Sequence, residues 1–306
     1  MQELRNKLNE FIPEDVNLHL LIRNNKTKEY RVLTTELNEN IRTGLINNTK
    51  NMFDSILAKD YIIEEYSAIN QYDAHAIETK DIDQIPLLQD INEFVNDDLD
   101  YYRSSHMENK DQIWAFIVVL GNNEMTMFQR CQPKKLLKPN KALRIKELDN
   151  GHFSHFEDTI LTIDPQMDCI SYNEKMYIFK KTPFEEIFGV MDELKENVTT
   201  KLSDISQDGI LVDLDEFYGF CSRDKYKIKT LSQILDDGGF GRLTEENISQ
   251  LNESHDLGLE LEEGKVKLTP EITRKVLKIM NKDCVNEAIS NEPYISHSKT
   301  PVRREN

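Results

Sequence analysis

The 306-residue chain has no apolar run close to the roughly 20 residues needed to span a membrane. Its longest apolar run, Ile113–Leu120, is only the length of one strand. The first residues, MQELRNKLNE, are charged and lack the apolar region of a signal peptide, so secretion is not expected. These absences favour a soluble intracellular protein.

The chain also lacks closely spaced cysteines. Its four cysteines are far apart and form no CxxC motif; they are Cys131, Cys169, Cys221 and Cys284. A zinc cage or a redox pair is therefore not expected, and neither is another cofactor. We expect reduced, buried thiols in a cytosolic protein.

Positive charge is scarce, and what there is lies unevenly along the chain. There are 38 Lys and Arg against 55 Asp and Glu, a net charge of −17, which disfavours general nucleic-acid binding because phosphates repel such a protein. Residues 81–100 contain seven acids and no base, whereas residues 111–150 contain seven bases and four acids. One segment is therefore basic within an acidic protein.

The clearest structural pattern lies in residues 156–189. The β-branched run Thr159–Ile163 predicts a strand, which Asp164-Pro165 interrupts because proline cannot donate to a sheet. Cys169–Tyr172 and Met176–Phe179 then predict a hairpin closed by the turn Asn173-Glu174-Lys175.

A long amphipathic helix is expected directly after this hairpin. Thr182 with Glu185 three residues later resembles a capping box, and Pro183 suits the first helical position. Apolar residues then recur at intervals of three and four: Phe184, Ile187, Met191, Leu194, Val198, Leu202 and Ile205.

The rest of the chain predicts an α+β protein. Before residue 150 we expect a helix over 1–12, a hairpin of Leu18–Ile22 and Tyr30–Thr34, a helix over 37–56, extended segments over 61–78, a helix over 85–102, and strands Ile113–Leu120 and Met125–Arg130. After residue 205 the pattern is helical, with a small hairpin over 257–268 and a helix begun by Thr269-Pro270.

The length favours two domains. We predict an N-terminal domain over residues 1–150 with a mixed or antiparallel sheet, then a hairpin-plus-helix core and a helical C-terminal region over 151–306. The boundary near residue 150 is soft, because no low-complexity linker marks it.

The basic tract, Gln132–Lys146 (QPKKLLKPNKALRIK), is the candidate DNA-binding segment. Lysines on an extended loop can follow a phosphate backbone, and arginines can add bidentate contacts. The candidate residues include the preceding arginine: Arg130, Lys134, Lys135, Lys138, Lys141, Arg144 and Lys146. The alternative is a solvated loop that balances acidic surface elsewhere.

Two other functions stay open. Asp73 followed by Glu78-Thr79-Lys80 contains the minimum of a metal-dependent nuclease site, with two acids to hold Mg²⁺ and a lysine to orient water. The acidic helix expected over 85–102 could instead bind a basic protein, which would make the chain an interaction scaffold.

Two blocks of the sequence resemble the KwaB family, the soluble partner of the two-component Kiwa anti-phage system. The first contains Asp168, a following hydrophobic strand, the run MYIF, and Phe184-Glu185 at the start of a helix. The second is the C-terminal segment Lys278–Val302, where a helix and a connector precede PYISHSKTPV.

This resemblance implies a cytoplasmic homodimer that binds DNA and is recruited to the inner face of the cell membrane by the membrane-embedded protein KwaA. It implies action against phage DNA replication and transcription. No catalytic or metal-binding residue comes with the family, so a non-enzymatic protein is expected.

Overall fold

The computed structural model describes most of the chain. It describes residues 1–68, 76–96, 99–103, 107–108, 110–132, 136–137, 145–148, 152–155, 160–203, 211, 214–255, 257–286 and 293–295. The chain divides into two compact units, one of Met1–Ser67 with Gln71–Gly189, the other of Ala68–Asn70 with Val190–Asn306. This division differs from the predicted boundary near residue 150, because the hairpin after that point joins the sheet of the first unit.

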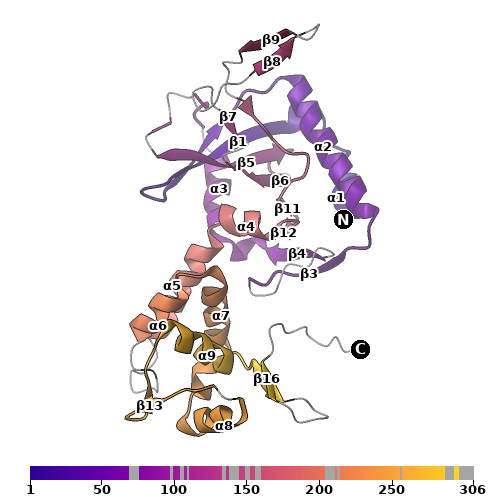
Figure 1. Ribbon diagram of the computed structural model, residues 1–306. Helices are drawn as coiled ribbons and strands as arrows, with labels where there is room; N and C mark the ends of the chain where they lie inside the picture. Colours follow the sequence, from indigo (N-terminus) through magenta and orange to yellow (C-terminus); the bar gives the residue numbers. More distant parts are fainter. Residues whose placement is uncertain are drawn as a thin grey trace. The chain divides into compact units, whose positions relative to one another are not determined.

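An eight-stranded mixed sheet forms the centre of the first unit (Figure 1), in the order β2-β1-β5-β6-β11-β12-β4-β3. The β3–β4 pair is parallel and the other neighbours are antiparallel. The strands are β1 (Val16–Asn24), β2 (Tyr30–Thr34), β3 (Ile62–Glu65), β4 (Ala76–Asp81), β5 (Asp111–Leu120), β6 (Met125–Arg130), β11 (Cys169–Tyr172) and β12 (Lys175–Ile178). The predicted α+β class with a mixed sheet is confirmed.

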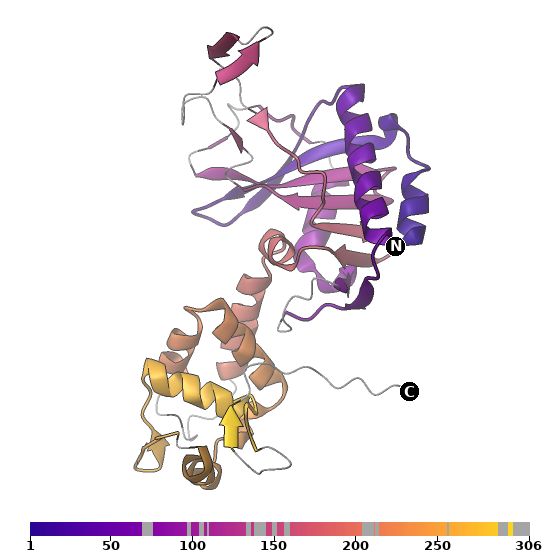
Figure 2. The same ribbon diagram turned by 45° about the vertical axis from the view of Figure 1, so that its right-hand side comes forward.

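One face of the sheet is covered by α1 (Gln2–Leu8) and α2 (Glu39–Leu57), which lie together beside it in both views (Figures 1 and 2). Alternate residues of β5 pack in this core with side chains of both helices. They are Phe116, Val118 and Leu120 of β5, Leu4 and Leu8 of α1, and Phe53 of α2. Removing such side chains from water is the main source of stability. The buried residues that alternate with these, Ala115, Ile117 and Val119, face the other side of the sheet, as strand geometry requires.

The opposite face is packed by α4 (Lys181–Ile187). The ring of Phe128 on β6 lies edge-on to Phe188, with centroids 5.2 Å apart, and Phe184 lies 5.2 Å from Phe188. The central strand β5 is therefore buried on both faces, which explains its continuous apolar run.

The predicted hairpin at the centre of the sequence is confirmed. β11 and β12 pair antiparallel through Cys169↔Ile178 to Tyr172↔Lys175. Asn173 and Glu174 form a two-residue turn with φ of 48° and 60°, the geometry that matches the twist of paired strands. The preceding expected strand is reduced to β10 (Ile160–Leu161), which pairs with β7 (Leu136–Leu137) and not with the large sheet.

The single long helix predicted after this hairpin was wrong. It is divided into α4 and α5 (Val190–Ser203), and Gly189 between them has φ +67°. A left-handed residue ends a helix even where the apolar spacing continues. The predicted cap was also wrong: α4 begins at Lys181, before Thr182, and has no side-chain cap.

The helix expected over residues 85–102 is shorter than predicted. α3 (Pro86–Asn96) ends before Leu99. Tyr101 instead forms a bridge with Thr34, and the Tyr102 N–H donates to the Thr34 carbonyl over 2.8 Å. This segment thus satisfies backbone groups at the edge strand β2, an interaction that helical periodicity cannot indicate.

The second unit is mainly helical. Its elements are α5, α6 (Leu214–Cys221), α7 (Lys225–Asp236), α8 (Glu245–His255), the hairpin β13 (Leu261–Glu262) and β14 (Lys265–Val266), α9 (Pro270–Met280), β15 (Cys284–Asn286) and β16 (Pro293–Ile295). Their apolar sides form a core of their own. The predicted cap of α9 is confirmed, since the Thr269 hydroxyl accepts from the Ile272 N–H.

The cysteines are free, as predicted. Cys131, Cys169 and Cys221 are buried, and Cys284 is half-buried. Burial raises the pKa of the Cys221 thiol to about 12. Such thiols act as small apolar side chains rather than nucleophiles.

His19 of β1 makes the stability of the first unit depend on pH. It lies between Thr34 of β2 and Ile117 of β5, its imidazole is buried, and burial lowers its pKa to about 4. Its Nδ1 has no hydrogen-bond partner among the described residues. The folded state therefore disfavours protonation of this ring.

We predict that His19→Leu reduces the loss of stability in mild acid. The unfolded chain protonates this histidine below about pH 6.5, whereas the folded state resists protonation until about pH 4, so stability falls with pH across that window. Between pH 7 and pH 5 the variant should lose about 2 kcal/mol less free energy of unfolding than the wild type. Urea unfolding at both pH values measures this, and equal losses would contradict it.

Candidate functional site

Of the seven predicted DNA-binding residues, the structure describes Arg130 and Lys146. Arg130 is the last residue of β6, and Lys146 lies in β8 (Ile145–Leu148), which pairs with β9 (His152–His155). The other predicted DNA-binding residues lie outside the described residues: Lys134, Lys135, Lys138, Lys141 and Arg144. Their expected role stays a prediction.

Arg130 fixes the end of β6 where the basic tract begins. Its guanidinium is buried, and Nη1 donates to the carbonyls of Trp114 (2.6 Å) and Cys131 (2.5 Å). Nε donates to the Glu186 carboxylate of α4 over 3.2 Å. The guanidinium carbon also lies 3.5 Å from the centre of the Trp114 ring, a cation–π contact. Its hydrogen-bonding groups are thus directed into the protein.

Asp168 lies next to Arg130 at the end of β6. This buried carboxylate accepts the Arg130 backbone N–H at Oδ2 over 2.6 Å and pairs through Oδ1 with Lys180 Nζ over 2.9 Å. Its main chain pairs with Phe128 on β6 and with the residues that lead into α4. The aspartate noted in the first family block therefore joins three elements, a structural role rather than a catalytic one.

A second charged cluster lies where β4 meets α4. Lys181 Nζ is 3.0 Å from Glu78 Oε1 and donates to the Ser67 carbonyl over 2.5 Å, and both charged side chains are buried. Beside them the Tyr66 hydroxyl donates to Glu185 Oε1 over 3.1 Å. The carboxyl oxygen Oε2 of Glu78 is buried and has no hydrogen-bond partner among the described residues.

This environment makes the charged form of Glu78 less favourable than it is in water. Burial raises the pKa of its carboxyl group, Lys181 opposes that shift, and the negative charges of Glu64 and Glu185 add to it. Sequence reasoning identified Glu78 but missed Lys181. Adjacent Lys180 and Lys181 look equivalent in the sequence, although one pairs with Asp168 and the other with Glu78.

The nuclease hypothesis receives no geometric support from this cluster. Asp73 lies outside the described residues, and one oxygen of Glu78 is engaged by Lys181. Lys80 lies two residues along β4, with its Nζ 5.5 Å from the Tyr66 ring centre. Within the described parts of the chain, no three His, Cys, Asp or Glu side chains are grouped to hold a metal ion.

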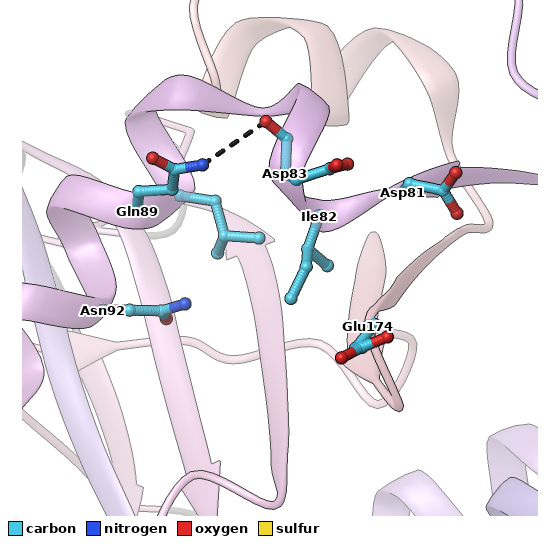
Figure 3. A pocket seen from close by; sticks show the side chains of 7 residues that line it. Asp81, Ile82, Asp83, Gln89, Asn92 and Glu174 are labelled. Atoms are coloured by element: carbon cyan, nitrogen blue, oxygen red, sulfur yellow. Dashed lines mark hydrogen bonds between the residues drawn. The ribbon is translucent and has the colours of Figure 1, made fainter.

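An acidic hollow lies elsewhere in the first unit, between the start of α3 and the β11–β12 turn (Figure 3). It has a volume of about 550 Å³ and is lined by three carboxylates, from Asp81, Asp83 and Glu174. The Gln89 side chain donates to the Asp83 carbonyl over 3.3 Å and so ties the first turns together. The hollow suits a cationic group and repels phosphate.

Comparison with known proteins identifies the family. A family model described as Kiwa protein KwaB-like matches residues 110–290, more than half of the chain. The chain belongs to the KwaB family. The match begins at β5, includes the basic tract and extends to β15, so it starts earlier than the resemblance noted in the sequence. No curated protein and no solved structure matches significantly.

KwaB membership makes this protein a component of the Kiwa anti-phage defence system, and the family implies KwaA as its partner in that system. None of the described helices combines the length and the apolar character needed to cross a membrane.

We predict that Lys181→Met destabilises this KwaB protein strongly. The substitution leaves the Glu78 carboxyl group buried without its cation, which typically costs about 3–5 kcal/mol. The double variant Lys181→Met, Glu78→Gln should recover most of that loss, because no charge is then buried. Urea unfolding of the three proteins measures the effect, and a double variant no more stable than the single one would contradict it.

Proposed function

We propose that this KwaB protein is a non-enzymatic DNA-binding effector. In this proposal it acts as a homodimer in the cytoplasm, is recruited by KwaA to the inner face of the cell membrane, and blocks replication and transcription of phage DNA. The basic tract Gln132–Lys146 supplies the contacts to the phosphate backbone.

The charge pattern supports a role for the tract. Two of the four acids in residues 111–150 are neutralised by cations from other parts of the chain. Asp111 pairs with Arg31 over 2.6 Å, and Glu124 pairs with Lys7 over 2.6 Å. Fewer carboxylates of this segment are therefore left to compete with DNA for its lysines than the composition alone indicates.

The anchoring of Arg130 also supports it. A segment that leaves the sheet from a fixed, buried residue needs less ordering when it binds than a tract with a free start. Arg130 then holds the tract rather than touching phosphate, and the DNA contacts belong to Lys134, Lys135, Lys138, Lys141, Arg144 and Lys146.

We predict that replacing Lys134, Lys135, Lys138 and Lys141 by Glu weakens DNA binding at least about tenfold at low salt and lowers the salt dependence of binding by up to about four counterions. Gel retardation of duplex DNA at several salt concentrations measures both. The control replaces Lys26, Lys28, Lys50 and Lys59 by Glu, which changes the net charge equally. Unchanged binding by the tract variant, or equal loss in the control, would exclude the tract as the site.

The nuclease alternative has a direct test. We expect supercoiled plasmid to stay intact when incubated with the purified protein and Mg²⁺ or Mn²⁺. Nicking that disappears in both Glu78→Ala and Lys80→Ala would establish the nuclease instead. Lys80 is needed as well as Glu78, because a loss in Glu78→Ala alone could reflect unfolding around the buried ion pair.

The interaction-scaffold alternative is favoured by one observation, the acidic hollow lined by Asp81, Asp83 and Glu174. A basic segment of a partner protein would fit it. The DNA-retardation experiment separates this function from the proposed one, since a pure scaffold retards no DNA at low salt.

A further inference from the structure

The second unit contains a small hollow with a cationic rim between α7 and α9, two helices in contact with each other (Figure 1). We call it the α7–α9 hollow. Its volume is about 210 Å³. Three basic side chains line it: Lys227 from α7, with Arg274 and Lys278 from α9. Leu277 and Thr230, which are buried, also line it.

The lining of this hollow is positive overall, with three basic side chains against the two carboxylates of Asp224 and Asp283. Lys227, Arg274 and Lys278 form no ion pair with any described residue. The two acids in its lining have other partners: Asp224 accepts the N–H groups of Tyr226 (2.8 Å) and Lys227 (3.3 Å), and Asp283 accepts from the Asn281 side chain over 3.0 Å.

Neighbouring cations on the same unit show the contrast. Lys275, also on α9, pairs with Glu271 one turn earlier over 3.4 Å. Lys201 of α5 pairs with Asp236 at the end of α7. In a chain with a net charge of −17, a hollow where three cations without an ion pair outnumber two carboxylates is an exception, and it indicates a site for an external anion.

Tyr226 narrows the identity of that anion. Its side chain is 60% exposed at the first turn of α7, where the Asp224 cap fixes the backbone, and its ring contacts no other ring in the described chain. An exposed aromatic ring beside unpaired cations is the arrangement with which proteins hold single-stranded nucleic acid, since bases stack on the ring while cations hold the phosphates. A carboxylate-bearing peptide would use the cations but leave the ring unused.

We propose that the α7–α9 hollow binds a phosphate of single-stranded nucleic acid and that Tyr226 stacks on an adjacent base. This goes beyond the proposed tract contact and does not depend on it. The basic tract has lysines without interleaved aromatic residues and suits a duplex backbone, whereas the hollow combines both elements of a single-strand site.

The experiment measures fluorescence anisotropy of a labelled 12-residue oligothymidylate with the full-length protein at low salt. The test variant is Lys227→Glu, Arg274→Glu. The matched control is Lys225→Glu, Lys275→Glu, which places the same charge change on the same two helices outside the hollow. We expect the test variant to bind at least about tenfold more weakly and the control to change less than about threefold.

A third variant tests the ring. Tyr226→Ala should weaken binding of the oligothymidylate about tenfold, and Tyr226→Phe should preserve it, because stacking needs the ring and not the hydroxyl. The residue is mostly exposed, so neither change should alter the urea unfolding midpoint. Equal binding by the wild type and Tyr226→Ala would overturn the stacking contact and with it the proposal.

Other outcomes also decide the matter. An equal loss of oligothymidylate binding in the test and control variants would mean that the loss comes from the change in net charge alone, and it would exclude the α7–α9 hollow as the site. A labelled 12-residue polyglutamate that binds as well as the oligonucleotide, with the same losses, would identify an acidic protein as the ligand instead. If the tract variant alone abolishes single-strand binding, the hollow is not the site, while the proposed role of the tract is retained.

Discussion

The hydrogen bond and the ion pair of the buried Asp168 carboxylate hold together the elements at the centre of the first unit. One oxygen accepts the backbone N–H of Arg130, and the other pairs with Lys180. Its own carbonyl accepts two N–H groups, from Phe179 and Lys180, which directly precede α4. One residue thus connects the end of β6, the start of β11 and the entrance to the helix that covers the sheet. Such a carboxylate is stable in the interior only because its oxygens are satisfied.

The direction of the chain on either side follows from that connection. Because Arg130 is held through its backbone by Asp168 and through its side chain by Trp114 and Glu186, the segment after β6 leaves the sheet at a defined point. The same corner fixes α4, and α4 brings Lys181 to Glu78. The clusters around Asp168 and Glu78 are therefore connected through α4, and the basic tract follows Arg130 at the edge of this arrangement.

The sequence predicts those elements whose signals are local. The hairpin of β11 and β12 follows from two β-rich runs around Asn173-Glu174, and α9 follows from the Thr269-Pro270 start. The predictions that failed concern the ends of helices, which depend on contacts with distant residues or on the conformation of a single residue. α3 is shorter than predicted, and Asp100 and Tyr102 instead form hydrogen bonds with Thr34 at the edge strand β2. The helix predicted after the hairpin is interrupted at Gly189, although the apolar spacing continues past it. Periodicity reports which face of an element is apolar, not where a tertiary contact ends it.

The same limit applies to charge. Sequence reasoning placed the working surface on the basic tract because lysines are dense there, and it counted Arg130 among them. The number of lysines in a segment does not show which of them already have an anionic partner. In the structure Arg130 pairs with Glu186 and Lys181 pairs with Glu78, whereas Lys227, Arg274 and Lys278 form no ion pair with a described residue. A cation already paired with a buried carboxylate must give up that partner before it can bind phosphate, and the loss would leave the carboxylate desolvated and alone. In so acidic a protein, a positive charge without an ion pair is therefore a stronger guide to anion binding than a high local number of lysines, and it points to the second unit.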